Sequence, residues 1–182
     1  MITVQNRALK QLLWVGMGSI SMFFAGLTSA YIVRKGEGNW VEFVLPEWFW
    51  YSTITIILSS VILILAQQNI KKDKSIFSLV LGVLVLGLLF TFFQFNGWNE
   101  LTSKGIYLTG KGSNVAGSFL YILTLAHLVH LIGGVIALLV TAINAKRKKY
   151  SSENYLGLEI ASIYWHFLSI LWVYLFCFLT YL

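Results

Sequence analysis

The sequence predicts an all-α, polytopic membrane protein in which five transmembrane helices form one domain over residues 1–182. Hydrophobic residues make up 58% of the chain and charged residues only 11%, and the mean hydropathy is +0.77. This balance is far more apolar than that of a soluble domain. The apolar residues also gather in five long runs, each with about the 20 residues that a helix needs to cross a bilayer. We place these spans at about 12–33, 48–67, 77–95, 117–143 and 156–182.

The first two spans have different boundary signals. Arg7 and Lys10 precede the first apolar run, and the basic pair 34–35 ends it. This run exceeds the roughly 7–15 apolar residues of a signal peptide, so we expect a retained helix. The second span begins in the aromatic cluster 48–51, which is typical of an anchor at the membrane surface. Its serine and threonine side chains should bond to their own backbone or to a neighbouring helix.

The third span follows a short basic turn and is expected to end near Gln94, at the membrane surface. The longest connection then covers about 96–116 and contains neither metal-ligand spacing nor a phosphate-binding pattern. The fourth span follows this connection. A basic run at 146–149 separates it from the fifth span. Because that loop is short, the last two helices should be antiparallel neighbours.

Three histidines lie in otherwise apolar surroundings on the last two spans. His127 and His130 are three residues apart, so they share one face of the fourth helix, and the small residues Gly133 and Gly134 continue that face. A polar side chain facing lipid would be costly, so this face should meet protein, a lipid head group or water.

On the fifth span, Glu159, Ser162, His166 and Ser169 also share one face. We therefore expect a buried structural or lipid-contacting network that contains His127, His130, Glu159 and His166. Glu159 lies about one turn into its helix, so it could instead reach toward the basic loop. We expect no catalytic residue and no metal site in this chain, and the single cysteine, Cys177, excludes an internal disulfide.

Spacing alone leaves three roles open for the histidines. They could join helices or contact lipid, they could clamp a haem as in b-type membrane anchors, or they could belong to a proton path. A proton path needs further titratable groups across the membrane, and the first three spans supply none. A small transporter is disfavoured because no helix is interrupted by glycine or proline at mid-depth.

The basic residues predict the orientation of the chain in the membrane. The N-terminus and the second and fourth loops carry 9 Lys and Arg residues, whereas the first and third loops and the C-terminus carry 4. The N-terminus should therefore be cytoplasmic and the C-terminus outside. We expect Lys146, Arg147, Lys148 and Lys149 to contact anionic lipid head groups. The net charge of +6 resides in these short loops, so nucleic acid is not an expected partner.

Two motifs resemble signatures of subunit III of the haem–copper terminal oxidases. Residues 124–134, TLAHLVHLIGG, are similar to T-G-x-H-x-x-H-x-x-G-G, and residues 157–167, GLEIASIYWHF, are similar to G-x-E-x-x-x-x-Y-W-H-F. Shorter similarities lie at 24–31, 87–94 and 114–119. Five spans are similar to the shorter bacterial form of this subunit, which lacks the first two helices of the seven-helix form.

The resemblance implies an accessory subunit of a bacterial cytochrome c oxidase in the cytoplasmic (inner) membrane. Such a subunit binds no cofactor directly, lies beside subunit I, which holds haem and copper, and carries phospholipid in a cleft between its helices. It supports the stability and proton uptake of its partner in aerobic respiration. A quinol oxidase or a nitric-oxide-reductase-associated homologue is the alternative, and a b-type haem anchor of a dehydrogenase is more remote. Membership in a respiratory supercomplex stays open.

Two positions depart from the family pattern. The family usually places a glutamate on the first of these five helices, where this sequence has Ile20. The family also places an aspartate shortly after Y-W-H-F, where this sequence has Ser169. Both changes remove a carboxylate from the membrane, and the change at Ile20 argues against a proton-handling role for the first span.

Overall fold

A computed structural model describes the chain except for residues 1–3, 39, 41–42, 111–112, 153 and 182. The part so described contains five α-helices and no strand, and each helix is long and apolar enough to cross a membrane. This confirms the predicted all-α, five-span fold. The helices are α1 (Val4–Gly36), α2 (Trp48–Ile70), α3 (Phe77–Ser103), α4 (Val115–Lys146) and α5 (Leu156–Tyr181).

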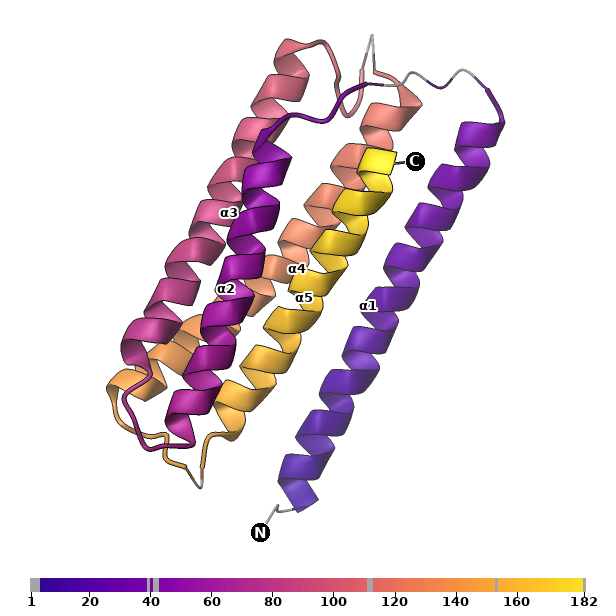
Figure 1. Ribbon diagram of the computed structural model, residues 1–182. Coiled ribbons are helices and arrows are strands. Elements are labelled where there is room, and N and C mark those ends of the chain that lie inside the picture. The colour runs from indigo at the N-terminus through magenta and orange to yellow at the C-terminus, as the bar shows by residue number, and fades with distance from the viewer. Residues whose placement is uncertain (1–3, 39, 41–42, 111–112, 153, 182) are drawn as a thin grey trace.

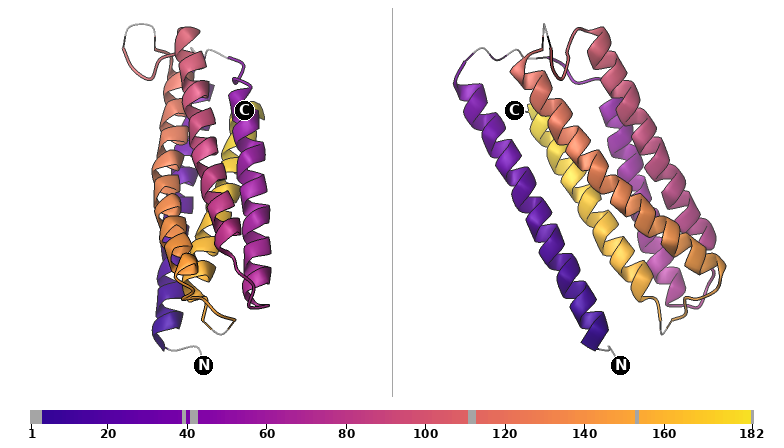
Figure 2. Two further views of the ribbon diagram at one scale, coloured as in Figure 1. Left: turned by 90° about the vertical axis from the view of Figure 1, so that its left-hand side faces the viewer. Right: turned by 180° about the vertical axis from the view of Figure 1, so that it is seen from behind.

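Four of the helices form a bundle, and the first lies against its outside. α2, α3, α4 and α5 contact one another in a ring, whereas α1 contacts only α4 and α5 within the described residues (Figure 1). Successive helices alternate in direction, so the chain ends lie at opposite ends of the molecule (Figure 1). The α2–α3 and α4–α5 connections lie at the end that carries the N-terminus, as both views in Figure 2 show.

Several helices extend beyond the apolar runs that predicted them. α1 begins at Val4 and therefore includes Arg7 and Lys10. α3 continues to Ser103, so Gln94 is not at the end of the helix; it is buried inside the bundle. The extension is held in place by packing, because Leu101 is fully buried. A polar segment can stay helical beyond the hydrocarbon region when its backbone bonds are satisfied within the helix.

The start of α4 shows how a local signal sets a helix boundary. Asn114 has an extended backbone, and its Oδ1 accepts a hydrogen bond of 2.6 Å from the Gly117 N–H. An asparagine in this position satisfies one of the free N–H groups of the first turn. The α3–α4 connection is therefore shorter than the predicted 96–116, because it begins after Ser103 and ends at this cap.

The interior of the bundle is rich in aromatic side chains. Trp165 and Trp172 of α5, Phe49 of α2 and Phe90 of α3 are almost completely buried. Large apolar side chains such as Ile132 and Ile136 of α4 are instead more than half exposed on the outside of the helices. This distribution is expected for a bundle that is surrounded by lipid tails.

Candidate functional site

Four hydroxyl groups on α2 form cross-helix hydrogen bonds in the interior of the bundle. Ser52, Thr53 and Ser59 are buried, and Ser60 is half-buried. Each takes a side-chain partner from α3 or α5, as expected for small polar residues that join membrane helices. These bonds join Gln94 Nε2 to Ser52 (2.9 Å), Trp172 Nε1 to Thr53 (2.9 Å), Trp165 Nε1 to Ser59 (2.9 Å) and the His166 ring to Ser60.

Trp165 is the side chain that brings four helices together. Its indole is fully buried and donates to Ser59 of α2. It also packs where two glycines leave room: a Cβ at Gly87 of α3 would lie 2.7 Å from Trp165 Cη2, and a Cβ at Gly134 of α4 would lie 3.1 Å from Cε3. The second glycine of the G-G pair and the tryptophan of the Y-W-H-F motif therefore fit against each other.

His127 is enclosed by aromatic rings. Its side chain is fully buried, with ring centroids 5.9 Å from Phe90 and 5.2 Å from Trp172. Neither ring nitrogen has a hydrogen-bond partner among the described residues. A buried polar group without a partner carries a desolvation cost, so this imidazole is held by packing rather than by protein hydrogen bonds.

His130 lies one turn further along α4, at the junction with α1 and α5. Its Nδ1 is 2.7 Å from the Ala126 carbonyl oxygen of its own helix. Its ring centroid lies 5.7 Å from that of Phe24 on α1. The Tyr164 hydroxyl of α5 donates to the His130 carbonyl oxygen at 3.2 Å. The Y-W-H-F motif of α5 thus contacts two different helices: Tyr164 bonds to α4, and His166 bonds to α2.

Glu159 pairs with a residue that the sequence did not suggest as its partner. Lys10 Nζ of α1 lies 2.6 Å from Glu159 Oε1, and about a third of each side chain is exposed. The alternative expectation, that Glu159 reaches toward the basic 146–149 loop, does not match this contact. The reason is geometric: the extra helical turns at the start of α1 bring Lys10 alongside the beginning of α5.

The four residues of the expected network therefore have separate partners. No hydrogen bond between described side chains joins His127, His130, Glu159 and His166 to one another; they contact Phe90 and Trp172, Ala126, Lys10 and Ser60, respectively. Ser162 is also buried, with no partner for its hydroxyl among the described atoms. Sequence periodicity had not identified Trp165 as a central residue, although the paired glycines were a signal for close helix packing.

The described part of the chain offers no cluster for a metal. No group of three or more His, Cys, Asp or Glu side chains is arranged to hold an ion there, and Cys177 is a free, exposed thiol. At the two positions that depart from the family pattern, Ile20 packs against the core and the Ser169 hydroxyl donates to the Trp165 carbonyl oxygen. Lys146 ends α4, and the basic residues 147–149 follow it on the surface.

Comparisons of the chain with a family model and with individual proteins point to the same family. A family model described as "Cytochrome c oxidase subunit III" matches residues 44–182. The chain is 29% identical over 176 residues to the probable cytochrome c oxidase subunit 3 of Nocardia farcinica, covering 89% of this chain and 82% of that relative. It is 28% identical over 173 residues to cytochrome c oxidase subunit 3 of Thermostichus vulcanus, covering 87% of this chain and 79% of that relative.

Proposed function

Because this chain belongs to the cytochrome c oxidase subunit III family, we propose that it is a non-catalytic subunit of a bacterial aerobic terminal oxidase. The observation that carries the proposal is the family match, which includes four of the five helices and both motifs. Membership implies a multi-pass membrane protein that associates with other oxidase subunits. We assign the bacterial cytoplasmic membrane as its location and cytochrome c as the electron donor of the complex, consistent with the names of its bacterial relatives.

The absence of a redox role is supported by the histidine environments. A bis-histidine haem site needs two imidazoles that face one cavity from opposite sides of the iron. Here Phe90 and Trp172 rings pack on His127, while His130 and His166 contact α4 and α2 atoms. This arrangement favours a structural role over the b-type haem anchor. We assign haem and copper to the partner subunit I.

The acidic residues suggest how the subunit supports proton uptake. α1 carries no carboxylate. The acidic residue of α5, Glu159, is paired with Lys10. We propose that the chain assists proton uptake by stabilising the catalytic subunit and its lipid, rather than by passing protons along its own helices. The replacement of family carboxylates by Ile20 and Ser169 is consistent with this role.

Lipid retention is the second part of the proposed role. An apolar pocket of about 360 Å³ lies between α1 and α5 beside Phe24 and Phe167, and another of about 470 Å³ lies between α2 and α5 beside Ile57 and Val173. Both are open grooves with few polar groups, which suits acyl chains. The exposed cations at 146–149 would contact anionic head groups at the end of the bundle.

Purification from the native membrane tests this proposal. The chain is tagged and extracted gently, and its reduced-minus-oxidised visible spectrum is recorded with mass spectrometry of co-purifying proteins. We expect a haem spectrum that travels with a larger haem–copper subunit and is lost when the two are separated. A b-type band that stays with the isolated chain would contradict the non-catalytic role and would make His127, His130 and His166 ligand candidates.

A further inference from the structure

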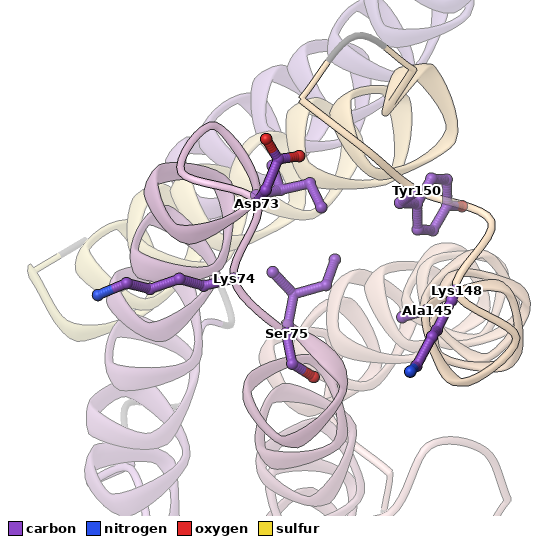
Figure 3. Close-up of a pocket in the computed structure, with 8 residues that line it drawn as sticks. Asp73, Lys74, Ser75, Ala145, Lys148 and Tyr150 are labelled. Atoms are coloured by element: carbon purple, nitrogen blue, oxygen red, sulfur yellow. The ribbon is translucent and has the colours of Figure 1, made fainter.

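A polar pocket lies at the end of the bundle that carries the N-terminus, between the α2–α3 and α4–α5 connections. Its volume is about 320 Å³. The floor is apolar and is formed by Ile70, Ile76 and Ala145, and the rim carries Asp73, Lys74, Ser75, Lys148 and Tyr150 (Figure 3). We propose that this pocket binds a phosphate group, carried either by an anionic phospholipid or by a water-soluble phosphate compound.

The two helices that end beside the pocket, α2 and α4, have the same hydrogen-bonding pattern at their C-termini. α2 ends with Asp73 N–H bonded to the Ile70 carbonyl and Lys74 N–H bonded to the Asn69 carbonyl. α4 ends in the same way, with Lys148 bonded to Ala145 and Lys149 to Asn144. In each case the residue at the turn is left-handed, Asp73 with φ 52° and Lys148 with φ 53°. Glycine normally occupies this position of the motif.

The left-handed backbone of Lys148 suggests that a lysine side chain is needed at this turn. A residue other than glycine is disfavoured in this conformation. Lys148 nevertheless occupies the turn and lines the pocket. Lys74 lies on the opposite side of the pocket from Lys148. In Figure 3 the ammonium groups of Lys74 and Lys148 extend outward from the pocket. Both side chains are exposed and flexible, so they can fold over a bound anion.

The charges around the pocket favour an anion. The two connections and the end of α4 contribute seven cations: Lys71, Lys72, Lys74, Lys146, Arg147, Lys148 and Lys149. They contain two acidic residues, of which Glu153 lies outside the described residues. The other, Asp73, also lines the pocket, and its Oδ1 accepts a hydrogen bond of 2.8 Å from the Ser152 N–H of the α4–α5 connection.

The donors and the depth of the pocket point to phosphate. Two ammonium groups, the Ser75 hydroxyl and the Tyr150 phenol can each donate to an oxyanion. The pocket has room for about ten water volumes, which is more than a bare phosphate needs. It also lies where α2 and α4 end, at the level where lipid tails give way to head groups. A glycerol unit could then lie on the apolar floor.

The test uses the purified oxidase complex containing the full chain. The pocket variant combines Lys74→Gln with Lys148→Gly, which also relieves the left-handed backbone. The control combines Lys72→Gln with Lys149→Gln, which removes the same charge from the same connections without changing a residue that lines the pocket. The probes are a photoreactive phosphatidylglycerol in phosphatidylcholine nanodiscs and inorganic phosphate added to delipidated complex. Ala145→Met is a further variant that fills the pocket and keeps every charge.

We expect the lipid probe to label the peptide that contains Tyr150 in the wild type and the control. The pocket variant should lose affinity by about thirtyfold, because it removes two cations near the anion, and Ala145→Met should also reduce labelling. If only inorganic phosphate binds, and binds through the same residues, the source is a water-soluble compound. Equal losses in the pocket variant and the control, or no binding of either probe, would overturn the proposal.

This inference deepens the lipid-binding part of the proposed function and rests on it. The two can fail separately. If the chain does not purify with a haem–copper subunit, the proposed function fails before any probe is added. If the complex purifies with its haem spectrum intact and the pocket binds neither probe, only the phosphate site is refuted.

Discussion

Gly87 shows how a missing side chain can hold a membrane bundle together. A Cβ there would lie 2.7 Å from Trp165 Cη2, closer than two non-bonded carbon atoms normally approach. We predict that Gly87→Ala destabilises the bundle by about 1–3 kcal/mol, the usual cost of overpacking. Unfolding of the purified protein in detergent, followed by tryptophan fluorescence, measures this change.

Gly82→Ala is the matched control for this substitution. Gly82 lies on the same helix, but nothing lies within 4 Å of a Cβ built there. We expect this variant to be as stable as the wild type. If both substitutions have the same effect, helix flexibility matters rather than the contact with Trp165.

His127 provides a second prediction at the scale of single residues. Since its ring nitrogens have no partner among the described residues, an apolar side chain of similar size should be tolerated. We predict that His127→Leu leaves the unfolding temperature unchanged or raises it. His127→Ala should lower stability by about 2–5 kcal/mol because it opens a cavity beside Phe90 and Trp172.

The comparison of these two variants also checks for a hidden partner. If His127→Leu is as harmful as His127→Ala, a ring nitrogen must bond to water or to another subunit. Native mass spectrometry of the complex would then show whether the neighbouring subunit is lost.

Sequence reasoning found the polar residues of the interior but not their partners. Helical spacing placed His127 and His130 on one face, and the sequence of the second span showed its hydroxyl side chains. In the structure, these histidines and hydroxyl groups lie at contacts between helices. The partners lie far away along the chain: Lys10 and Glu159 are 149 positions apart, and Trp165 and Ser59 are 106 apart. Periodicity within one helix carries no information about such pairs.

At the scale of helices, α1 is joined to the bundle by polar contacts as well as by packing. The Lys10–Glu159 pair is one, and the Tyr174 hydroxyl, which donates to Thr28 Oγ1 at 3.1 Å, is another. We predict that Glu159→Gln speeds hydrogen exchange in the first part of α1, measured by mass spectrometry in nanodiscs. Exchanging the two charges, Lys10→Glu with Glu159→Lys, should restore slow exchange.

An ion pair at the C-terminal end of α1 serves as the control. Arg34 pairs with Glu37, which lies just beyond the last residue of α1, and this contact does not join α1 to another helix. Glu37→Gln should leave exchange near Lys10 unchanged. Faster exchange in both variants would mean that any loss of charge loosens α1, and the specific role of Glu159 would be refuted.

Helix boundaries were predicted less well than helix identities, for a physical reason. Hydropathy detects the apolar run that crosses the bilayer, whereas a helix continues as long as its backbone bonds and packing allow. α3 therefore passes the predicted end at residue 95, and Gly97 packs on Phe49, with the position of a Cβ only 2.7 Å from the ring. A tertiary contact of this kind is not visible in an apolar run.

At the scale of the whole molecule, the distribution of cations predicts how the chain lies in the membrane. The end with the N-terminus and the α2–α3 and α4–α5 connections carries 9 of the 13 Lys and Arg residues. In a Cys177→Ser background, we predict that an impermeant maleimide labels Lys104→Cys in intact cells. Lys149→Cys should react only after permeabilisation, and the reverse pattern would invert the orientation.

The position of α1 also has a consequence for biogenesis. Among the described elements α1 contacts only α4 and α5, so during synthesis it has no helix partner in this chain until α4 is inserted. α2 and α3, in contrast, can pair as soon as both are inserted. A nascent chain that stops before α4 would leave α1 without either of the helices that it packs against. The docking of α1 is therefore a late step, which depends on helices that follow it by about 80 residues or more along the chain.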